Sequence, residues 1–117
     1  MTVTLYGIPN CDTVKKARTW LAQNGIDYRF HDFRKAGLSA ALVQEWLGRL
    51  DWEALVNRKG TTWRGLPEER KAAVCDAASA AALMLELPSV IKRPVLSTAK
   101  QTHVGFSDVL YQQIFTK

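Results

Sequence analysis

The first third of the chain predicts a strand, a helix and a second strand in close succession. Thr2–Tyr6 and Ile26–His31 both alternate apolar and polar residues and are rich in β-formers. A helix is predicted over residues 11–24, with Asn10 as its N-cap and Gly25 as its C-terminal stop. Because a helix that joins two strands of one sheet makes a right-handed connection, the two strands are expected to lie parallel.

The middle of the chain predicts helices. Ser39 is placed to cap a helix that runs to about Leu50, and Asp51 is placed to cap a shorter one. Gly60–Gly65 is expected to be a loop, because it is rich in glycine and threonine. Pro67 opens a helical stretch that is broken near Cys75–Asp76 and closed by Pro88.

The end of the chain returns to β-structure. Pro94–Ser97 and Thr102–Gly105 predict a two-stranded hairpin, and Ser107 is expected to cap a final helix. The fold class is therefore α/β, a small mixed β-sheet covered by helices and interrupted by an all-helical insertion.

Length and composition indicate one folded domain. The chain has 117 residues, of which 47% are hydrophobic and 23% are charged, as in ordinary globular domains. The expected core comprises residues 1–36 and 90–117, with the insertion over about 38–88. Met1–Tyr6 does not resemble a signal peptide, and no apolar run reaches the roughly 18 residues of a membrane span. A cytoplasmic protein that does not contact a membrane is expected.

The net charge of +5 favours an anionic partner. No stretch combines dense cations with interleaved aromatic residues, so nucleic-acid binding is not expected. A small anionic molecule or an acidic tripeptide is the more economical partner.

Cys11 is the strongest candidate for chemistry. It follows a strand and a turn and stands at the start of a predicted helix, where backbone N–H groups and the helix dipole favour an anion. A thiol in such a place is commonly activated as the thiolate, which is the nucleophile. Lys15 lies one turn further along on roughly the same side, while Asp12 opposes the effect. The alternative is an inert, half-buried cysteine at a turn.

Counting residues narrows the chemistry of this cysteine. A phosphatase-type loop needs an arginine at the position of Ala17, and a dithiol site needs a cysteine at the position of Val14. Cys11 is therefore expected to act as a single thiol, and glutathione is the obvious cytosolic reductant. Cys75 is interpreted as a small core or near-surface filler. Neither cysteine belongs to a CxxC or CxxH pattern, so no metal site is expected.

Four motifs resemble the arsenate-reductase-like family, which includes the ArsC, Spx and YffB branches, and the chain is most similar to the YffB branch. They occur in the family's order and with its gaps: Tyr6-Gly-Ile-Pro-Asn-Cys11, Asn57-Arg-Lys-Gly60, Ile91-Lys-Arg-Pro94 and Gly105-Phe-Ser-Asp108. The resemblance implies a thioredoxin-like fold with a helical insertion, and an oxidoreductase with Cys11 as its nucleophile.

The resemblance also implies roles for the other motif residues. Arg58 and Arg93 match two of the three arginines that hold the oxyanion in arsenate reductases, and Pro94 matches the cis-proline that faces the cysteine in thioredoxin-like folds. Gly105, Ser107 and Asp108 are similar to the segment that binds the γ-glutamyl end of glutathione in glutaredoxins. A helix start there is suited to a carboxylate, and the Asp108 side chain is suited to an ammonium group.

Three positions depart from true arsenate reductases. Gly105 replaces the third arginine, Gly7 replaces a histidine upstream of the cysteine, and Asp12 stands where a Gly-Thr-Ser-type cradle begins. Arsenate would meet one cation fewer and one carboxylate more, which argues against efficient arsenate reduction.

The preferred hypothesis is a glutathione-dependent thiol reductase that acts on a small oxidised or anionic substrate. One alternative is an arsenate reductase linked to glutathione and glutaredoxin. Another is a non-catalytic regulator resembling the Spx proteins, which share the fold and bind RNA polymerase. Those regulators usually carry a CxxC at this site, and Val14 replaces its second cysteine.

Overall fold

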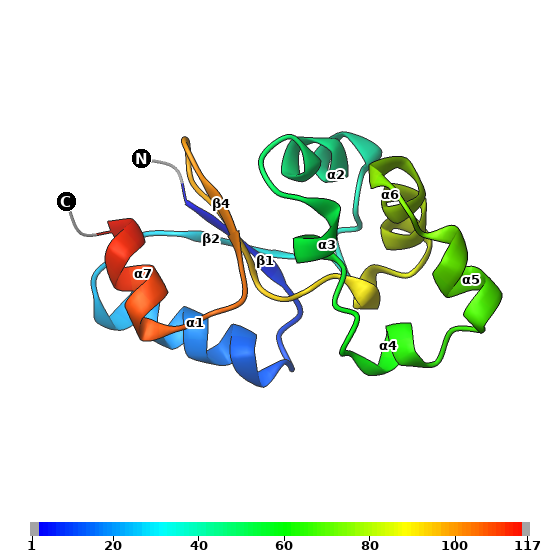
Figure 1. The fold of residues 1–117 in the computed structure, drawn as a ribbon. Helices are drawn as coiled ribbons and strands as arrows, with labels where there is room; N and C mark the ends of the chain where they lie inside the picture. The colour runs from blue at the N-terminus through cyan, green and yellow to red at the C-terminus, as the bar shows by residue number, and fades with distance from the viewer. Residues whose placement is uncertain (1–2, 116–117) are drawn as a thin grey trace. The chain divides into compact units, whose positions relative to one another are not determined.

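A computed structural model describes residues 3–115 of the chain (Figure 1). The elements follow in the order β1 (Thr4–Gly7), α1 (Asp12–Gln23), β2 (Arg29–Asp32), α2 (Ala40–Leu47), α3 (Trp52–Leu55), α4 (Thr61–Arg64), α5 (Glu68–Ala73), α6 (Ala77–Glu86), the 3₁₀ helix η1 (Pro88–Val90), β3 (Val95–Ser97), β4 (Thr102–Val104) and α7 (Asp108–Phe115).

The chain divides into two compact units. The first comprises Met1–Lys35 and Arg93–Lys117, and the second comprises Ala36–Lys92. The first unit contains all four described strands together with α1 and α7, whereas the second is helical. That all 117 residues form one domain, with an insertion over 38–88, stays a prediction.

The sheet of the first unit has the strand order β2-β1-β3-β4. β1 and β2 pair in parallel, with Leu5 opposite Phe30, while β3 pairs antiparallel with both β1 and β4. The parallel pair confirms the predicted strand–helix–strand unit, although β1 ends at Gly7 and Thr2 lies outside the described residues. The hairpin of β3 and β4 is also confirmed.

One face of the sheet is covered by α1 and α7, which lie side by side in Figure 1. The core between them contains Leu5 and Leu96 from the sheet, Leu21 from α1 and Tyr111 from α7. All four side chains are fully buried. Burial of each aliphatic side chain here stabilises the fold by about 1.5–3 kcal/mol.

The second unit packs α2 against α6 around fully buried Trp46. Ser39 accepts a hydrogen bond from Leu42 N–H (3.1 Å) and so caps α2, as predicted. The predicted break near Cys75 is also present, because Asp76 and Ser79 form a capping box that starts α6.

Two local predictions are wrong. The N-cap of α1 is Cys11 rather than Asn10, because the turn after β1 closes with Cys11 N–H on the Ile8 carbonyl and delays the helix by one residue. Gly60–Gly65 is not an open loop: Thr61–Arg64 forms α4, whose single turn is closed by Arg64 N–H on the Gly60 carbonyl at 3.1 Å.

Candidate functional site

Cys11 is the residue on which α1 begins. Its backbone is extended (φ −99°, ψ 126°), and its carbonyl accepts the N–H of Lys15 at 2.9 Å. The side chain is half-buried and makes no capping hydrogen bond. Its sulfur is therefore at the positive end of the helix dipole without being committed to a capping contact.

Two cations near Cys11 in the sequence have different environments. Lys15 is exposed one turn along α1. Arg18 instead packs back against the sheet: its Nε donates to the Tyr28 hydroxyl at 3.1 Å, and its guanidinium lies 4.2 Å from the centroid of the Phe30 ring. Of the two, only Lys15 remains a candidate for interaction with a substrate at Cys11, because the Arg18 side chain packs α1 against Tyr28 and Phe30.

Pro94 and Gly105 come together at one end of the hairpin. Gly105 N–H donates to the Pro94 carbonyl at 2.9 Å, both residues are buried, and the Arg93–Pro94 peptide bond is cis, as the resemblance implied. The strand register places this pair at the end of the sheet where β1 stops and the turn to Cys11 begins. Arg93, half-buried, precedes them at the same end.

Ser107 and Asp108 begin α7. The Ser107 hydroxyl accepts the N–H of Leu110 at 3.0 Å, and the Ser107 carbonyl accepts that of Tyr111 at 3.1 Å, which confirms Ser107 as a cap. Asp108 is exposed. Gly105, two residues before Ser107, has a φ of +78°, a conformation that favours glycine.

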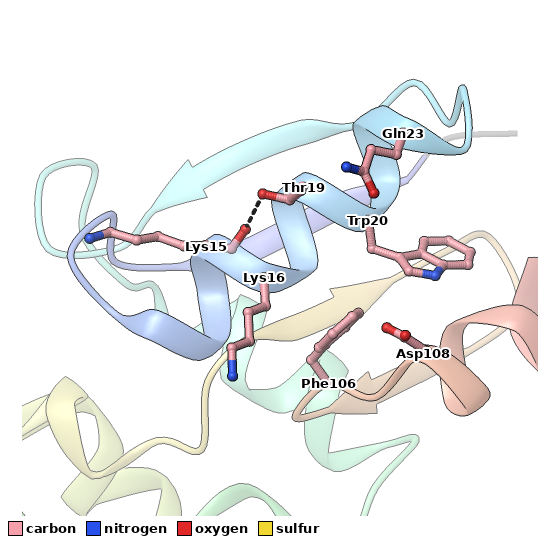
Figure 2. A pocket seen from close by; sticks show the side chains of 7 residues that line it. All are labelled: Lys15, Lys16, Thr19, Trp20, Gln23, Phe106 and Asp108. Atoms are coloured by element: carbon pink, nitrogen blue, oxygen red, sulfur yellow. Dashed lines mark hydrogen bonds between the residues drawn. The ribbon is translucent and has the colours of Figure 1, made fainter.

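A pocket of about 360 Å³ lies between α1 and the start of α7, as Figure 2 shows. It joins two predicted site residues, Lys15 and Asp108, with five further residues: Lys16, Thr19, Trp20, Gln23 and Phe106. The helical spacing of Lys16, Trp20 and Gln23 puts them on one face of α1, which was the available sequence signal. The approach of Phe106 to that face depends on the folded sheet.

Arg58 and Cys75 belong to the second unit. The Arg58 guanidinium lies 3.2 Å from a carboxylate oxygen of Glu53, and 5.8 Å from the centroid of the Trp52 ring. Cys75 is exposed in the link between α5 and α6, so it is a surface residue rather than a core one. The role of Arg58 toward a substrate stays a prediction.

Within residues 3–115, no group of three His, Cys, Asp or Glu side chains is arranged to hold a metal ion. No helix in the same range is long and apolar enough to cross a membrane.

The sheet order, with helices packed on the sheet and the cysteine at the start of α1, is that of a thioredoxin-like fold. The ArsC family model matches residues 6–114, and the chain belongs to the ArsC family.

Two solved structures and one curated relative illustrate this membership. A structure named as a YffB protein is 46% identical, with a TM-score of 0.90, over 96% of this chain and 97% of that one. An arsenate reductase (ArsC) related protein from Brucella melitensis is 52% identical, with a TM-score of 0.79, over 100% and 97%. The global transcriptional regulator Spx 2 of Lactococcus lactis is 25% identical over 108 residues, which are 91% of this chain and 80% of that protein.

Proposed function

We propose that this protein is a glutathione-dependent thiol reductase with Cys11 as its single nucleophile. The observation that carries the proposal is the position of Cys11, which is half-buried, occupies the N-cap of α1 and makes no capping hydrogen bond through its sulfur. A thiolate in such a position is favoured by the first-turn N–H groups and by the helix dipole.

The reaction is an exchange of thiols in two steps. In the first, Cys11 Sγ attacks the glutathione sulfur of a mixed disulfide RS–SG, so that the Cys11–SG bond forms, the RS–SG bond breaks and RS⁻ leaves and takes up a proton. In the second, the Cys11–SG disulfide is attacked by the thiolate of free glutathione, which releases the Cys11 thiolate and glutathione disulfide. The sum is RSSG plus GSH giving RSH plus GSSG.

The remaining site residues are assigned to binding. Pro94 and Gly105 lie against the cysteinyl part of glutathione, while the N–H groups at the start of α7, after Ser107, receive the γ-glutamyl carboxylate. Asp108 meets the ammonium group of the same residue. Lys15 and Arg93 orient anionic groups of the substrate. The shared end of the sheet supports the first of these assignments.

The environment of Val14 supports a single-thiol mechanism. A dithiol site would place its second cysteine at this position, but the Val14 side chain is fully buried against the end of β1. A resolving thiol at this position would have no access to a substrate. This also disfavours an Spx-like redox switch, although the relative from Lactococcus lactis is named as a transcriptional regulator.

The named relatives make arsenate reduction the second candidate, since the structure from Brucella melitensis is described as arsenate reductase related. Two departures from the arsenate-binding pattern are required by the local structure. Any side chain at Gly7 would collide with Val14, and Gly105 has a positive φ. Neither position accepts the histidine or arginine of an arsenate reductase without local rearrangement, which favours the thiol reductase.

The experiment is turnover of a glutathionylated peptide with glutathione, read as formation of glutathione disulfide, with arsenate assayed in parallel. Cys11→Ser is expected to abolish turnover, and Cys75→Ser is the matched control that retains it. Full activity in Cys11→Ser would end the proposal. Arsenate turnover that exceeds disulfide turnover would instead favour arsenate reduction as the function.

A further inference from the structure

The pocket between α1 and the start of α7 has two fixed aromatic walls. Trp20 and Phe106 each pack edge-on against buried Tyr111, with ring centroids 5.5 and 4.7 Å from it, and Trp20 also stacks on Phe115. Both wall residues are only half-buried, so part of each ring remains open to the pocket. Preformed apolar walls around about 360 Å³ suit an apolar group of a ligand.

The charges of the pocket are unequal. Two lysines, Lys15 and Lys16, line the pocket, but only one carboxylate, that of Asp108, does. None of the three forms an ion pair within the described part of the chain. An acidic group on the ligand would be attracted to the lysines. Gln23 supplies a hydrogen-bond acceptor that suits an N–H group of a peptide backbone, while the Asp108 carboxylate is assigned to the ammonium group of glutathione.

The pocket extends beyond Lys15 and Asp108, the lining residues that the proposed function already uses for glutathione and the anionic groups of the substrate. Its lining on α1 runs from Lys15 to Gln23, four to twelve residues after Cys11. At 1.5 Å of rise per residue this is about 6–18 Å along the helix axis. An extended peptide advances about 3.3 Å per residue, so the near end of this lining is roughly two residues, and the far end roughly five, from a cysteine engaged at Cys11. Glutathione has only one residue on each side of its cysteine.

We infer that this pocket binds the polypeptide part of the substrate: an apolar residue next to an acidic one, two to five positions from the reacting cysteine. The inference rests on the proposed function and narrows its substrate class from small disulfides to glutathionylated peptides and proteins. Trp20 and Phe106 hold the apolar side chain, while Lys16 attracts the acidic one; the Lys15 side chain points away from the aromatic walls in Figure 2.

The test compares two glutathionylated peptides with a small disulfide. The first peptide is Gly-Leu-Glu-Gly-Gly-Cys-Gly-Gly-Glu-Leu-Gly, symmetric so that either chain direction suffices, with Glu three and Leu four positions from Cys. The second peptide replaces each Leu and Glu with Ser. The native protein is expected to show a KM at least about tenfold lower for the first peptide, from burial of one leucine. Bis(2-hydroxyethyl) disulfide reports the chemistry at Cys11 without a peptide in the pocket.

Charge substitutions at Gln23 test the location. Gln23→Glu is expected to raise the KM of the Leu-Glu peptide about two- to fivefold and Gln23→Lys to lower it by a similar factor. Turnover of the small disulfide should not change, because Gln23 is about 18 Å along α1 from Cys11, beyond the screening length of roughly 8–10 Å. Gln113→Glu and Gln113→Lys, on an exposed residue of α7 outside the pocket, are the matched controls.

A binding measurement separates failure of the inference from failure of the proposed function. The same peptide with Ser in place of Cys is titrated into Cys11→Ser protein, and the Trp20 indole N–H resonance is followed. A shift at Trp20 without Cys11-dependent turnover of the native protein would refute the reductase and leave the peptide site standing. Turnover with equal KM for both peptides, no Trp20 shift, or equal effects of the Gln23 and Gln113 variants would overturn the inference.

Discussion

Gly7, the last residue of β1, and Val14, in the first turns of α1, approach so closely that a Cβ atom on Gly7 would lie 2.8 Å from Val14 Cγ2. This distance is shorter than any ordinary carbon–carbon contact. Because Val14 is fully buried, it has no free space into which to move. The absence of a side chain at Gly7 thus lets the start of α1, with Cys11, lie directly on the end of β1.

Gly7→Ala is therefore expected to destabilise the protein by about 1–3 kcal/mol, the usual cost of overpacking a filled core. Val14→Ala removes the colliding methyl groups, so the double variant should lose less stability than the two single losses added together. Urea unfolding of the four proteins measures the coupling.

Gly48→Ala is the control for this series. Gly48 ends α2 with ordinary helical angles, and the nearest atom to its added Cβ, the Glu45 carbonyl oxygen, is 3.4 Å away. The Gly48→Ala variant should be as stable as the native protein or slightly more stable. If Gly7→Ala behaves like Gly48→Ala, the close approach does not constrain the fold.

Local sequence signals were sufficient to predict structure where a residue interacts with its own neighbours in the chain. The caps Ser39 and Ser107 and the alternation along β1 are of this kind and are confirmed, whereas β2 begins only at Arg29 and its burial does not alternate. The shift of the α1 N-cap from Asn10 to Cys11 was not predictable, because both residue types are compatible with a turn and a bond between Cys11 and Ile8 decides between them.

Of the candidate site, only the cysteine at the start of α1 was predictable from the sequence, and the pocket was not. Cys11 at a helix start follows from the order of strand, turn and helix, and the structure has it there. The pocket required α1 and Phe106 to meet across the fold, a contact between residues far apart in the chain. Periodicity along α1 marks Lys16, Trp20 and Gln23 as one face but does not say which segment lies opposite.

Cys11 should be alkylated faster than Cys75 at pH 7, although it is the less exposed of the two. Both precede or begin a helix, but Cys11 holds the N-cap of α1 itself, whereas the N-cap of α6 is the carboxylate of Asp76, next to Cys75. Peptide mass spectrometry after brief treatment with iodoacetamide measures both rates in one sample. Lys15→Ala should slow Cys11 by about two- to fivefold and leave Cys75 unchanged. A faster Cys75 would mean that exposure alone sets the rates and that Cys11 is inert.

The capping box of α6 should weaken in acid. Hydrogen bonds from the Ser79 N–H and hydroxyl, at 2.9 and 2.7 Å, hold the pKa of Asp76 below its usual value. A carboxylate with a lowered pKa in the folded state stabilises the protein above its unfolded value of about 3.9, and this contribution is lost as the pH falls through the folded value.

Asp76→Asn keeps a good cap but removes the titration. Its unfolding midpoint in urea should therefore fall less steeply than that of the native protein as the pH is lowered from 5 to 2. The comparison with the native protein is needed because Glu86, bonded to Arg70, also has a lowered pKa and contributes its own acid sensitivity. Identical slopes for the two proteins would show that the Asp76 carboxylate does not contribute.

Removal of a phenolic hydroxyl should lower the stability of the protein at Tyr28 but not at Tyr111. The Tyr28 hydroxyl accepts a hydrogen bond from Arg18 Nε, so Tyr28→Phe should cost about 0.5–1.5 kcal/mol. The Tyr111 hydroxyl is buried and has no hydrogen-bond partner among residues 3–115, so Tyr111→Phe should leave stability unchanged or raise it by up to about 1–2 kcal/mol.

The native protein and the Tyr111→Phe variant should also differ in how their stability depends on pH in alkali. Burial raises the pKa of Tyr111, so the neutral phenol stabilises the fold fully below the unfolded value of about 10, and that contribution declines as the pH rises above it toward the folded value. Between pH 9 and 11 the native protein should therefore lose stability more steeply than Tyr111→Phe, whereas at pH 7 the two differ only by the hydroxyl. Urea midpoints across this range measure the difference. A Tyr111→Phe protein that is less stable than native at pH 7 by as much as Tyr28→Phe would indicate that the hydroxyl of Tyr111 is hydrogen-bonded in solution.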